Sequence, residues 1–525
     1  MFAVLLTGLL VSQPMAAQHV AADTVVVCPE EFREALGPWL HYRAGQGHQA
    51  VVVSNLGSAG QIGRQIRELA HGGRLRFVVL VGDVEVGMWS YPKLRARCVP
   101  THYAKAEVNV LWGSEPHIAT DNAYADLDND GVPELAVGRL SVDTPQQLRA
   151  LVEKVIAYER STDFGRWRRR VNVVAGVGGF GWIGDKVLDT ATRFLLSQGI
   201  PGDYRASMTF GNWRSPYCPN PRLFHAAALE RLNEGAWFWV YLGHGQPLGL
   251  DHVHMPDGHY PIFSVDDVAK LRCARGAPIV LLLACHTGAF DASVDCLAER
   301  MVGQPRGPVA AVAGSRVTMP YAMSVLTSAM MEQLFKQHRP TLGEVILHAK
   351  RQAVAVPDET AEIRKTLDAI GAAISPAPRQ LAAERAEHLL LFNLLGDPLL
   401  RLRYPETVAL ECPTTASAGE PLHVSGVSPT EGRAVVELVV PRHRRDFEPP
   451  ARSEYSTCAE SLAQMQQTYR RANDRQLAAV ESGVSPGRFE VKLDVPEHAR
   501  GACRLRVFIE GGEGFSSGHA MVDVR

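Results

Sequence analysis

The sequence predicts an α/β fold with mainly parallel sheets, followed by a β-sandwich. From about residue 24 to residue 400, short β-branched runs alternate with helical stretches, a pattern typical of βαβ units. After Tyr404 and Pro405, short strands separated by Gly and Pro turns take over, which indicates packed antiparallel sheets. A chain of 525 residues is also too long for one ordinary hydrophobic core. We therefore expect several structural units.

The α/β region shows recognisable helix starts between its strands. Pro29 stands before two glutamates, and Ser264 forms a capping box with Asp267. Residues 279–283 are apolar throughout, as expected of a strand buried on both faces. The predicted strands are residues 24–27, 50–53, 77–81, 135–137, 171–175, 236–242, 278–284 and 309–313. The predicted helices are residues 30–44, 62–70, 146–160, 184–197, 222–233 and 321–337.

A polar and basic segment, residues 161–170, divides the α/β region into two units. In the last part of the chain, a polar helical stretch over residues 461–478 interrupts the strands. The strands predicted there are residues 408–410, 434–440, 488–495, 503–510 and 518–524. We expect a signal peptide over residues 1–22, α/β units over 23–160 and 161–404, and a sandwich over 405–525.

Composition and the N-terminus limit the class of protein. A formal net charge of −2, with 46% hydrophobic and 21% charged residues, is typical of a soluble protein that binds no nucleic acid. Residues 2–11 are mostly apolar and are followed by Ala16 and Ala17, which predicts a secretory signal and a secreted or periplasmic product. A buried first helix is the alternative. No other segment suits stable membrane insertion, and the nine cysteines form no CxxC zinc motif.

Two predicted strands end in residues that suit nucleophilic catalysis. Residues 236–242 lead into Gly243-His244-Gly245, and residues 278–284 lead into Cys285. One short helix and a loop separate the strands, so we expect parallel neighbours joined by a right-handed crossover. The carboxyl ends of such strands lie at the same edge of the sheet, where open α/β sheets bind ligands. His244 and Cys285 should therefore face one cleft.

An imidazole beside a thiol indicates acyl transfer. Cysteine attacks as its thiolate, and a nearby histidine can take the thiol proton and later protonate the leaving amine. The backbone N–H groups of Gly245 and Cys285 are candidates to bind the oxyanion, because glycine lets a substrate approach closely. Alternatively, Cys285 is only a small core residue and the Gly-His-Gly segment only a turn. The occurrence of both motifs, in this order and at strand ends, favours catalysis.

Further segments accompany these motifs: residues 120–131, 134–140, 284–291 and 393–398. Over about residues 24–403, the set resembles the gingipain family in the caspase–legumain–gingipain clan of cysteine peptidases. The resemblance implies two caspase-like subdomains followed by an immunoglobulin-like domain. It also implies a secreted cysteine endopeptidase that hydrolyses polypeptides through a Cys–His dyad and a thioester acyl-enzyme. Cleavage after Arg or Lys is not inferred, since no acidic specificity residue matches by motif.

The comparison with that family also yields two expected differences. We expect no long inhibitory pro-segment before the first strand and no long secretion domain after the sandwich. The sandwich itself is expected to bind a cell-surface or protein partner.

An acidic loop resembles the first part of a calcium-binding loop. Asp126, Asp128, Asp130 and Glu134 occupy positions 1, 3, 5 and 9, with a glycine at position 6. The bidentate glutamate usual at position 12 is missing, so another carboxylate, Asp121, would have to complete the shell. Calcium is therefore the expected cofactor, and a solvated acidic turn is the alternative.

Glu134 has a second interpretation. The resemblance to gingipains implies that a glutamate in the segment 134–139 orients the catalytic histidine, as the third group of a triad does. Glu134 begins a predicted buried strand, which favours this role over a metal ligand.

Two other functions compete with the peptidase. Gly176, Gly178 and Gly181 match a dinucleotide fingerprint after a strand, which would suit an oxidoreductase, but no acidic residue ends a second strand some twenty residues on. A secreted binding protein on a peptidase-like scaffold is the alternative from another class. The histidines at positions 252, 254 and 259 have no zinc-binding helical spacing.

Overall fold

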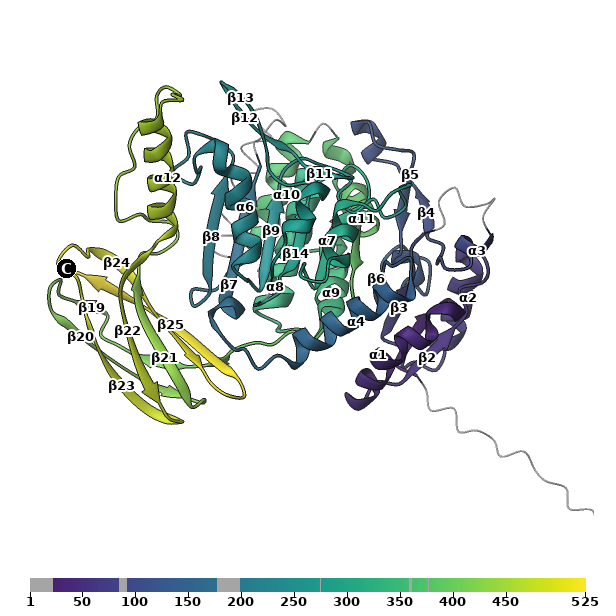
Figure 1. The fold of residues 1–525 in the computed structure, drawn as a ribbon, viewed down its shortest axis with the longest axis horizontal. Helices are drawn as coiled ribbons and strands as arrows, with labels where there is room; N and C mark the ends of the chain where they lie inside the picture. Colours follow the sequence, from purple (N-terminus) through teal and green to yellow (C-terminus); the bar gives the residue numbers. More distant parts are fainter. Residues whose placement is uncertain (1–21, 85–91, 177–198, 274, 358–360, 376) are drawn as a thin grey trace, which may run out of the picture.

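The computed structural model describes residues 22–84, 92–176, 199–273, 275–357, 361–375 and 377–525. Figure 1 shows the β1–β3 unit at one end, a layered α/β centre, and the β-sandwich at the opposite end. Within the described ranges, no helix is both long enough and apolar enough to cross a membrane. The predicted helix over residues 184–197 and most of the predicted signal peptide lie outside these ranges.

A single ten-stranded sheet forms the centre of the α/β region. Its strand order is β2-β1-β3-β6-β16-β15-β14-β9-β7-β8, and every neighbouring pair is parallel except β15 and β16. The strands are β1 (Thr24–Val27), β2 (Ala50–Val53), β3 (Phe77–Val81), β6 (Ala136–Leu140), β7 (Arg170–Ala175), β8 (Arg205–Phe210), β9 (Phe238–Leu242), β14 (Ile279–Leu283), β15 (Ala310–Gly314) and β16 (Phe392–Leu395).

The predicted mainly parallel architecture is confirmed, and each strand predicted for this region is present with small shifts at its ends. Strands β8 and β16 were not predicted. β16 lies between β6 and β15, so the two α/β units share one continuous sheet. Its apolar residues directly continue the pattern of the preceding helix α11 (Leu381–Leu391), and no turn residue separates the two elements.

Helices pack on both faces of the sheet (Figure 1). Side-chain caps start several of these helices. Thr144 Oγ1 accepts the N–H of Gln147 at 3.2 Å, and Pro145 takes the first helical position of α4. The Ser264–Asp267 capping box is also present and starts a 3-10 helix, Val265–Lys270. The helices are α1 (Arg33–Gly45), α2 (Ala59–Ala70), α3 (Pro92–Arg95), α4 (Pro145–Arg160), α6 (Phe224–Asn233), α7 (Leu297–Gly303), α8 (Pro320–Phe335), α9 (Leu342–Val354), α10 (Glu362–Ile374) and α11.

In the described part of the α/β region, three short antiparallel hairpins form outside the large sheet. They pair β4 (His102–Lys105) with β5 (His117–Thr120), β10 (Gly245–Gln246) with β11 (Gly249–Leu250), and β12 (His252–Met255) with β13 (Gly258–Pro261). The β12–β13 hairpin contains the histidines at 252, 254 and 259. Among the described residues, the side-chain groups spaced for a metal ion are acidic and include none of these histidines.

A buried ion pair lies inside the N-terminal half of the α/β region. The fully buried guanidinium of Arg139 on β6 donates from Nε and Nη2 to the two carboxylate oxygens of Asp121, each at 2.7 Å. Its Nη1 donates to the carbonyl oxygens of Gly82 and Val99. The Arg139 guanidinium is therefore paired only with groups inside the protein. Loss of Asp121 would leave a buried charge unpaired and destabilise the fold.

The C-terminal region is a β-sandwich of one six-stranded and one three-stranded sheet around its own apolar core. Helix α12 (Ala459–Asn473) lies between two of its strands in sequence, as predicted. The strands are β17 (Glu406–Thr407), β18 (Ala409–Glu411), β19 (Thr415–Ala416), β20 (Pro421–Ser428), β21 (Gly432–Val439), β22 (Gln476–Val484), β23 (Gly487–Asp494), β24 (Gly501–Glu510) and β25 (Phe515–Val524). Strands β17, β19, β20 and β22 were not predicted. The immunoglobulin-like assignment stays a prediction.

The sandwich docks against β8, the edge strand of the large sheet. Asn473 accepts the N–H of Met208 at 2.8 Å and donates to its carbonyl oxygen at 2.9 Å, so its amide takes the place of a further strand. Glu437 on β21, fully buried, accepts hydrogen bonds from Arg169 at 2.9 Å and from Arg506 at 2.6 Å. Polar and charged contacts thus attach the sandwich to the sheet.

Candidate active site

His244 and Cys285 follow two neighbouring parallel strands. β9 and β14 pair with Leu242 opposite Leu283, and each candidate residue lies two positions beyond that pair. Neighbouring strands are about 4.8 Å apart, so the two residues occupy adjacent positions at one edge of the sheet. The predicted pairing of these strands is confirmed. Both residues are partly exposed, as a site open to a substrate requires.

Gly245 brings the histidine turn into contact with the cysteine turn. A Cβ atom at position 245 would lie 2.8 Å from the carbonyl oxygen of Cys285 and 2.9 Å from Cβ of Ala284. A larger residue would therefore push the two turns apart. The hydroxyl of Tyr241 donates to the carbonyl oxygen of His244 at 2.8 Å and fixes the conformation of the histidine turn.

The sulfur of Cys285 has polar neighbours from the segment that follows β15. The backbone N–H of Thr318 donates to Sγ at 3.3 Å, and Oγ1 of the same residue lies 3.7 Å away. The sulfur therefore contacts both the backbone and the side chain of Thr318. Burial raises the pKa of the thiols of Cys28, Cys218 and Cys273 to about 12. All nine cysteines are free thiols.

An ion-pair network holds the residue after Cys285. His286 has a φ of 56°, in the left-handed region that residues other than glycine seldom adopt. Its N–H donates to the carbonyl oxygen of Arg316 at 3.1 Å, and its imidazole lies 3.0 Å from Glu115. Arg316 also binds both oxygens of Asp291, at 2.8 and 2.5 Å. These contacts hold the turn at Cys285 close to the segment that contains Arg316 and Thr318, whose N–H donates to the sulfur.

Helix α11, which was not predicted, supports the site with buried polar side chains. Glu387 accepts the backbone N–H groups of the three consecutive residues 107–109. His388 accepts the N–H of Met319 on Nε2 at 2.9 Å. Because Met319 directly follows Thr318, this bond fixes the segment that contacts the sulfur of Cys285. No sequence motif marks either residue, since their partners are distant in the chain.

Acidification is expected to weaken the support that His388 provides. Burial lowers the pKa of His388 from 6.5 to about 4, because the folded protein holds the neutral imidazole. The unfolded chain takes up a proton below pH 6.5, so this contribution to stability is complete above that pH and is lost as the pH falls to about 4. The loss amounts to roughly 3 kcal/mol.

Urea unfolding of wild type and His388→Gln at a series of pH values measures this effect. The glutamine variant should be less stable at neutral pH, and the difference should shrink steadily towards pH 4. Burial raises the pKa of Glu384 to about 7, which changes stability with pH in the opposite direction, so only the difference between the two proteins is informative. A difference independent of pH would contradict the prediction.

The acidic loop brings together three of the predicted calcium ligands. The carboxylates of Asp126, Asp128 and Asp130 each offer an oxygen within 4.8 Å of the others. Asn129 and Gly131 have φ values of 64° and 88°, which fold the chain back tightly. Asp126 accepts the N–H groups of these two residues at 2.7 and 2.9 Å. The loop thus directs several carboxylates toward one point.

Glu134 lies with this loop and not beside His244. Its carboxylate accepts the N–H of Leu127 at 2.8 Å and lies 3.6 Å from Arg351. Glu134 precedes β6, whereas His244 follows β9, and β16, β15 and β14 lie between those strands. Four strand spacings amount to about 19 Å. The fold therefore does not support Glu134 as the group that orients His244.

Asp121 is separate from the acidic loop cluster. Both of its carboxylate oxygens bind Arg139, and one of them also accepts the hydroxyl of Thr101 at 2.9 Å. The residue is buried, and its oxygens face a guanidinium that needs a counter-charge. The fold thus does not support Asp121 as a calcium ligand.

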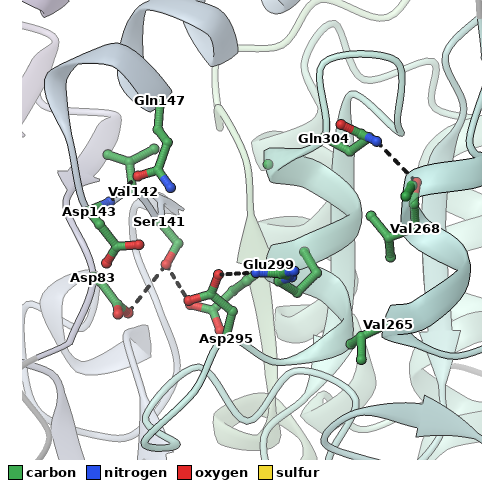
Figure 2. A pocket seen from close by; sticks show the side chains of 13 residues that line it. Asp83, Ser141, Val142, Asp143, Gln147, Val265, Val268, Asp295, Glu299 and Gln304 are labelled. Atoms are coloured by element: carbon green, nitrogen blue, oxygen red, sulfur yellow. Dashed lines mark hydrogen bonds and ion pairs between the residues drawn. The ribbon is translucent and has the colours of Figure 1, made fainter.

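A separate acidic pocket of about 240 Å³ lies where the loops after β3 and β6 meet α7 (Figure 2). Ser141 donates to Glu299 at 2.5 Å and lies 3.4 Å from Asp83. Burial, together with the charges of Asp143 and Asp295, raises the pKa of Asp83 to about 6. The pocket joins the two halves of the α/β region and contains none of the predicted catalytic residues.

Comparison with known proteins identifies the family. The sequence profile of peptidase family C25 matches residues 18–403. The chain belongs to peptidase family C25. This membership places it among the cysteine peptidases at the level of the family, and it confirms the resemblance to gingipains. It also favours a peptidase over a dinucleotide-dependent oxidoreductase, whose fingerprint at 176–181 lies outside the described residues except for Gly176.

Relatives of this C25 protein are distant in sequence. Lys-gingipain HG66 of Porphyromonas gingivalis is 22% identical over 291 residues, which are 53% of this chain and 14% of the relative. Gingipain R2 of P. gingivalis strain W83 is 21% identical over 330 residues, which are 60% of this chain and 40% of the relative. The chain therefore spans less than half the length of these relatives.

Solved structures show the same fold over nearly the whole C25 chain. The crystal structure of the Arg-specific cysteine proteinase gingipain R (RGPB) has a TM-score of 0.53 at 16% identity, covering 96% of this chain and 98% of that one. A complex of the RgpB pro- and mature domains gives 0.52 at 17% identity, covering 96% and 100%. The predicted fold class, caspase-like α/β followed by a sandwich, is confirmed.

Proposed function

We propose that this C25 protein is an exported cysteine endopeptidase in which Cys285 is the nucleophile and His244 its general acid/base. One observation supports this assignment above all: these two residues follow the paired strands β9 and β14 at matching positions, and Gly245 packs against the backbone of Cys285. An imidazole and a thiol at adjacent strand ends are the two groups that acyl transfer by a cysteine requires.

In the proposed reaction, the thiolate of Cys285 attacks the carbonyl carbon of a peptide bond in a polypeptide substrate. The backbone N–H groups of Gly245 and Cys285 bind the oxyanion of the tetrahedral intermediate. His244 then gives its proton to the leaving amine, and a thioester to Cys285 remains. His244 next takes a proton from water, which attacks the thioester and releases the acid product. The N–H of Thr318, which donates to Sγ of Cys285 at 3.3 Å, helps to position the sulfur.

Export is part of the proposal because the apolar residues 2–11 are followed by small residues, as in a secretory signal. Relatives named for Lys or Arg specificity both occur in the family, so we assign no preference for the residue before the cleaved bond. The expectation that the sandwich binds a cell-surface or protein partner stays a prediction.

Labelling with iodoacetamide at pH 6.5 tests the role of His244. The exposed Cys458 is replaced by serine in all proteins so that its reaction does not interfere. We expect Cys285 to react about tenfold faster than free cysteine, because the imidazole favours its thiolate. His244→Ala should bring the rate down to that of an ordinary thiol.

The matched control for this experiment is His252→Ala, which removes an exposed histidine from the hairpin that follows the site. It should leave the labelling rate unchanged. If Cys285 in the parent protein reacts no faster than free cysteine, a non-catalytic binding protein becomes the better interpretation.

We further propose that the acidic loop binds calcium through Asp126, Asp128 and Asp130, with Glu134 as the fourth carboxylate. Hard oxygen ligands on alternate residues of a tight loop suit this ion. In support, burial raises the pKa of Asp126 and of Glu134, an unfavourable state for carboxylates that a bound cation would relieve. Calcium would act structurally, since Glu134 lies four strand positions from His244.

Calcium addition is expected to raise the melting temperature of the purified protein, because a ligand of the folded state stabilises it by about 2.7 kcal/mol at a hundred times its Kd. Asp128→Asn should remove most of the shift, since Asp128 is exposed and its other contacts are slight. Asp143→Asn, in the separate acidic pocket, is the control and should keep it. An equal shift in both variants would contradict the site.

A further inference from the structure

A small cavity between the sandwich and the large sheet is lined mainly by positive charge. It encloses about 20 Å³, and five arginines from separate segments line it: Arg205, Arg442, Arg475, Arg504 and Arg506. Arg205 belongs to the edge strand β8, and the other four belong to the sandwich and to the segments that flank α12. The cavity therefore lies at the junction of the two parts.

Several bonds of these arginines go to neutral acceptors. Arg442 donates to the carbonyl oxygens of Ile200, Pro201 and Tyr204. Arg475 likewise binds two carbonyl oxygens and the hydroxyl of Tyr217. Neutral acceptors satisfy the geometry of a guanidinium but do not cancel its charge.

Two of the lining arginines have side-chain N–H groups without a partner. The Nε atom of Arg504 is buried and has no hydrogen-bond partner. The side chain of Arg205 is half-buried, and within the described part of the chain it makes no hydrogen bond or ion pair. A buried donor without an acceptor costs free energy, so Nε of Arg504 indicates a missing partner.

The nearby carboxylates are fewer than the arginines. Oε2 of Glu437 binds Arg506 and also Arg169, a sixth arginine just outside the cavity, and Oε1 has no hydrogen-bond partner. Asp203 accepts the hydroxyl of Ser517 and lies 3.5 Å from His519. Two carboxylates thus face six guanidinium groups in this region, and the excess charge is positive.

The clustering of these arginines lowers the pKa of some of them. Burial, and then the charges of Arg504, Arg506 and Arg475, lower the pKa of Arg442 to about 9. The pKa of Arg504 is lowered by burial and, less strongly, by Arg506, while the charge of Asp203 partly opposes this shift. Guanidinium groups do not lose their proton at neutral pH, so an anion is the remaining way to relieve the repulsion.

We propose that this cavity binds a small inorganic anion of the size of chloride, which bridges arginines of the sheet and of the sandwich. A space of about 20 Å³ admits a group about as large as one water molecule and excludes a larger organic anion. The bound anion accepts the free N–H groups of Arg504 and Arg205. It therefore strengthens the docking of the sandwich against β8.

Thermal unfolding of the full chain in two sodium salts tests the proposal. Chloride is compared with gluconate, which is too large for the cavity, at the same ionic strength and pH so that general screening is equal. We expect a saturable rise in melting temperature of about 3 °C or more in chloride. Bromide soaked into crystals should give an anomalous diffraction peak beside Nε of Arg504.

Variants separate this site from general salt effects. Arg504→Gln should show no rise in chloride, and in gluconate it should melt at or above the wild-type temperature because one repelling charge is gone. Arg488→Gln, which removes an arginine paired with Glu411 on the sandwich surface, should keep the full rise. If Arg504→Gln does not fold, Arg205→Gln serves instead. Equal wild-type melting in the two salts, a full rise in Arg504→Gln, or no bromide peak would overturn the proposal.

Discussion

Replacing Cys285 by alanine is expected to abolish peptide-bond cleavage while leaving the fold intact. The loss in kcat/KM should reach at least about 10⁴-fold, because no other group can form the acyl-enzyme. The side chain is only partly buried, and its hydrogen bonds are long, so the melting temperature should change little. Cleavage of a peptide library, together with thermal unfolding, measures both quantities.

Cys458→Ala is the matched control for this experiment. Cys458 is exposed, lies at the start of α12 and has no place in the proposed mechanism. It should keep full activity. Undiminished cleavage by the Cys285→Ala protein would refute the assignment of the nucleophile. It would not affect the fold or the family membership.

Replacing Asp121 by asparagine is expected to destabilise the protein by about 3–5 kcal/mol, because it leaves the fully buried charge of Arg139 without a counter-charge. The neutral amide can also accept at only one of the two positions that the guanidinium uses. Urea unfolding gives the free-energy change. Asp523→Asn, which removes an exposed ion pair with Arg525, should cost at most about 1 kcal/mol.

The Asp121→Asn protein also separates the two roles considered for this residue. If Asp121 acts only through Arg139, calcium should still raise the melting temperature of the variant by the wild-type amount. Loss of that calcium effect together with unchanged basal stability would instead make Asp121 a metal ligand and contradict the structural assignment.

Patterns local in the sequence predicted much of this fold. β-branched runs identified β1, β2 and β3, and the capping box of Ser264 and Asp267 identified the start of the helix Val265–Lys270, since these signals depend on near neighbours in the chain. β16 was missed because its apolar residues continue the helical pattern of α11. Only pairing with β6 and β15 makes this segment a strand, and that pairing depends on residues far away in the chain.

The candidate site likewise contains residues that the sequence could predict and residues that it could not. His244 and Cys285 could be found because a reactive residue after a buried strand is a local feature, and the chain order of the strands implies their pairing. The supporting residues could not be found. Thr318, Arg316 and His388 act through backbone contacts to partners distant in the chain, and no spacing rule predicts such contacts.

The sequence by itself determined that this is an α/β protein with a terminal sandwich, and that one histidine and one cysteine end two of its buried strands. Only the tertiary structure shows which groups the acidic side chains of Glu134 and Asp121 contact. A carboxylate in the sequence fits a metal, an arginine or a catalytic histidine equally well, because all three attract negative charge. Four intervening strand positions separate Glu134 from His244, and the buried guanidinium of Arg139 holds Asp121. Distance and desolvation, which exist only in the folded chain, choose among those partners.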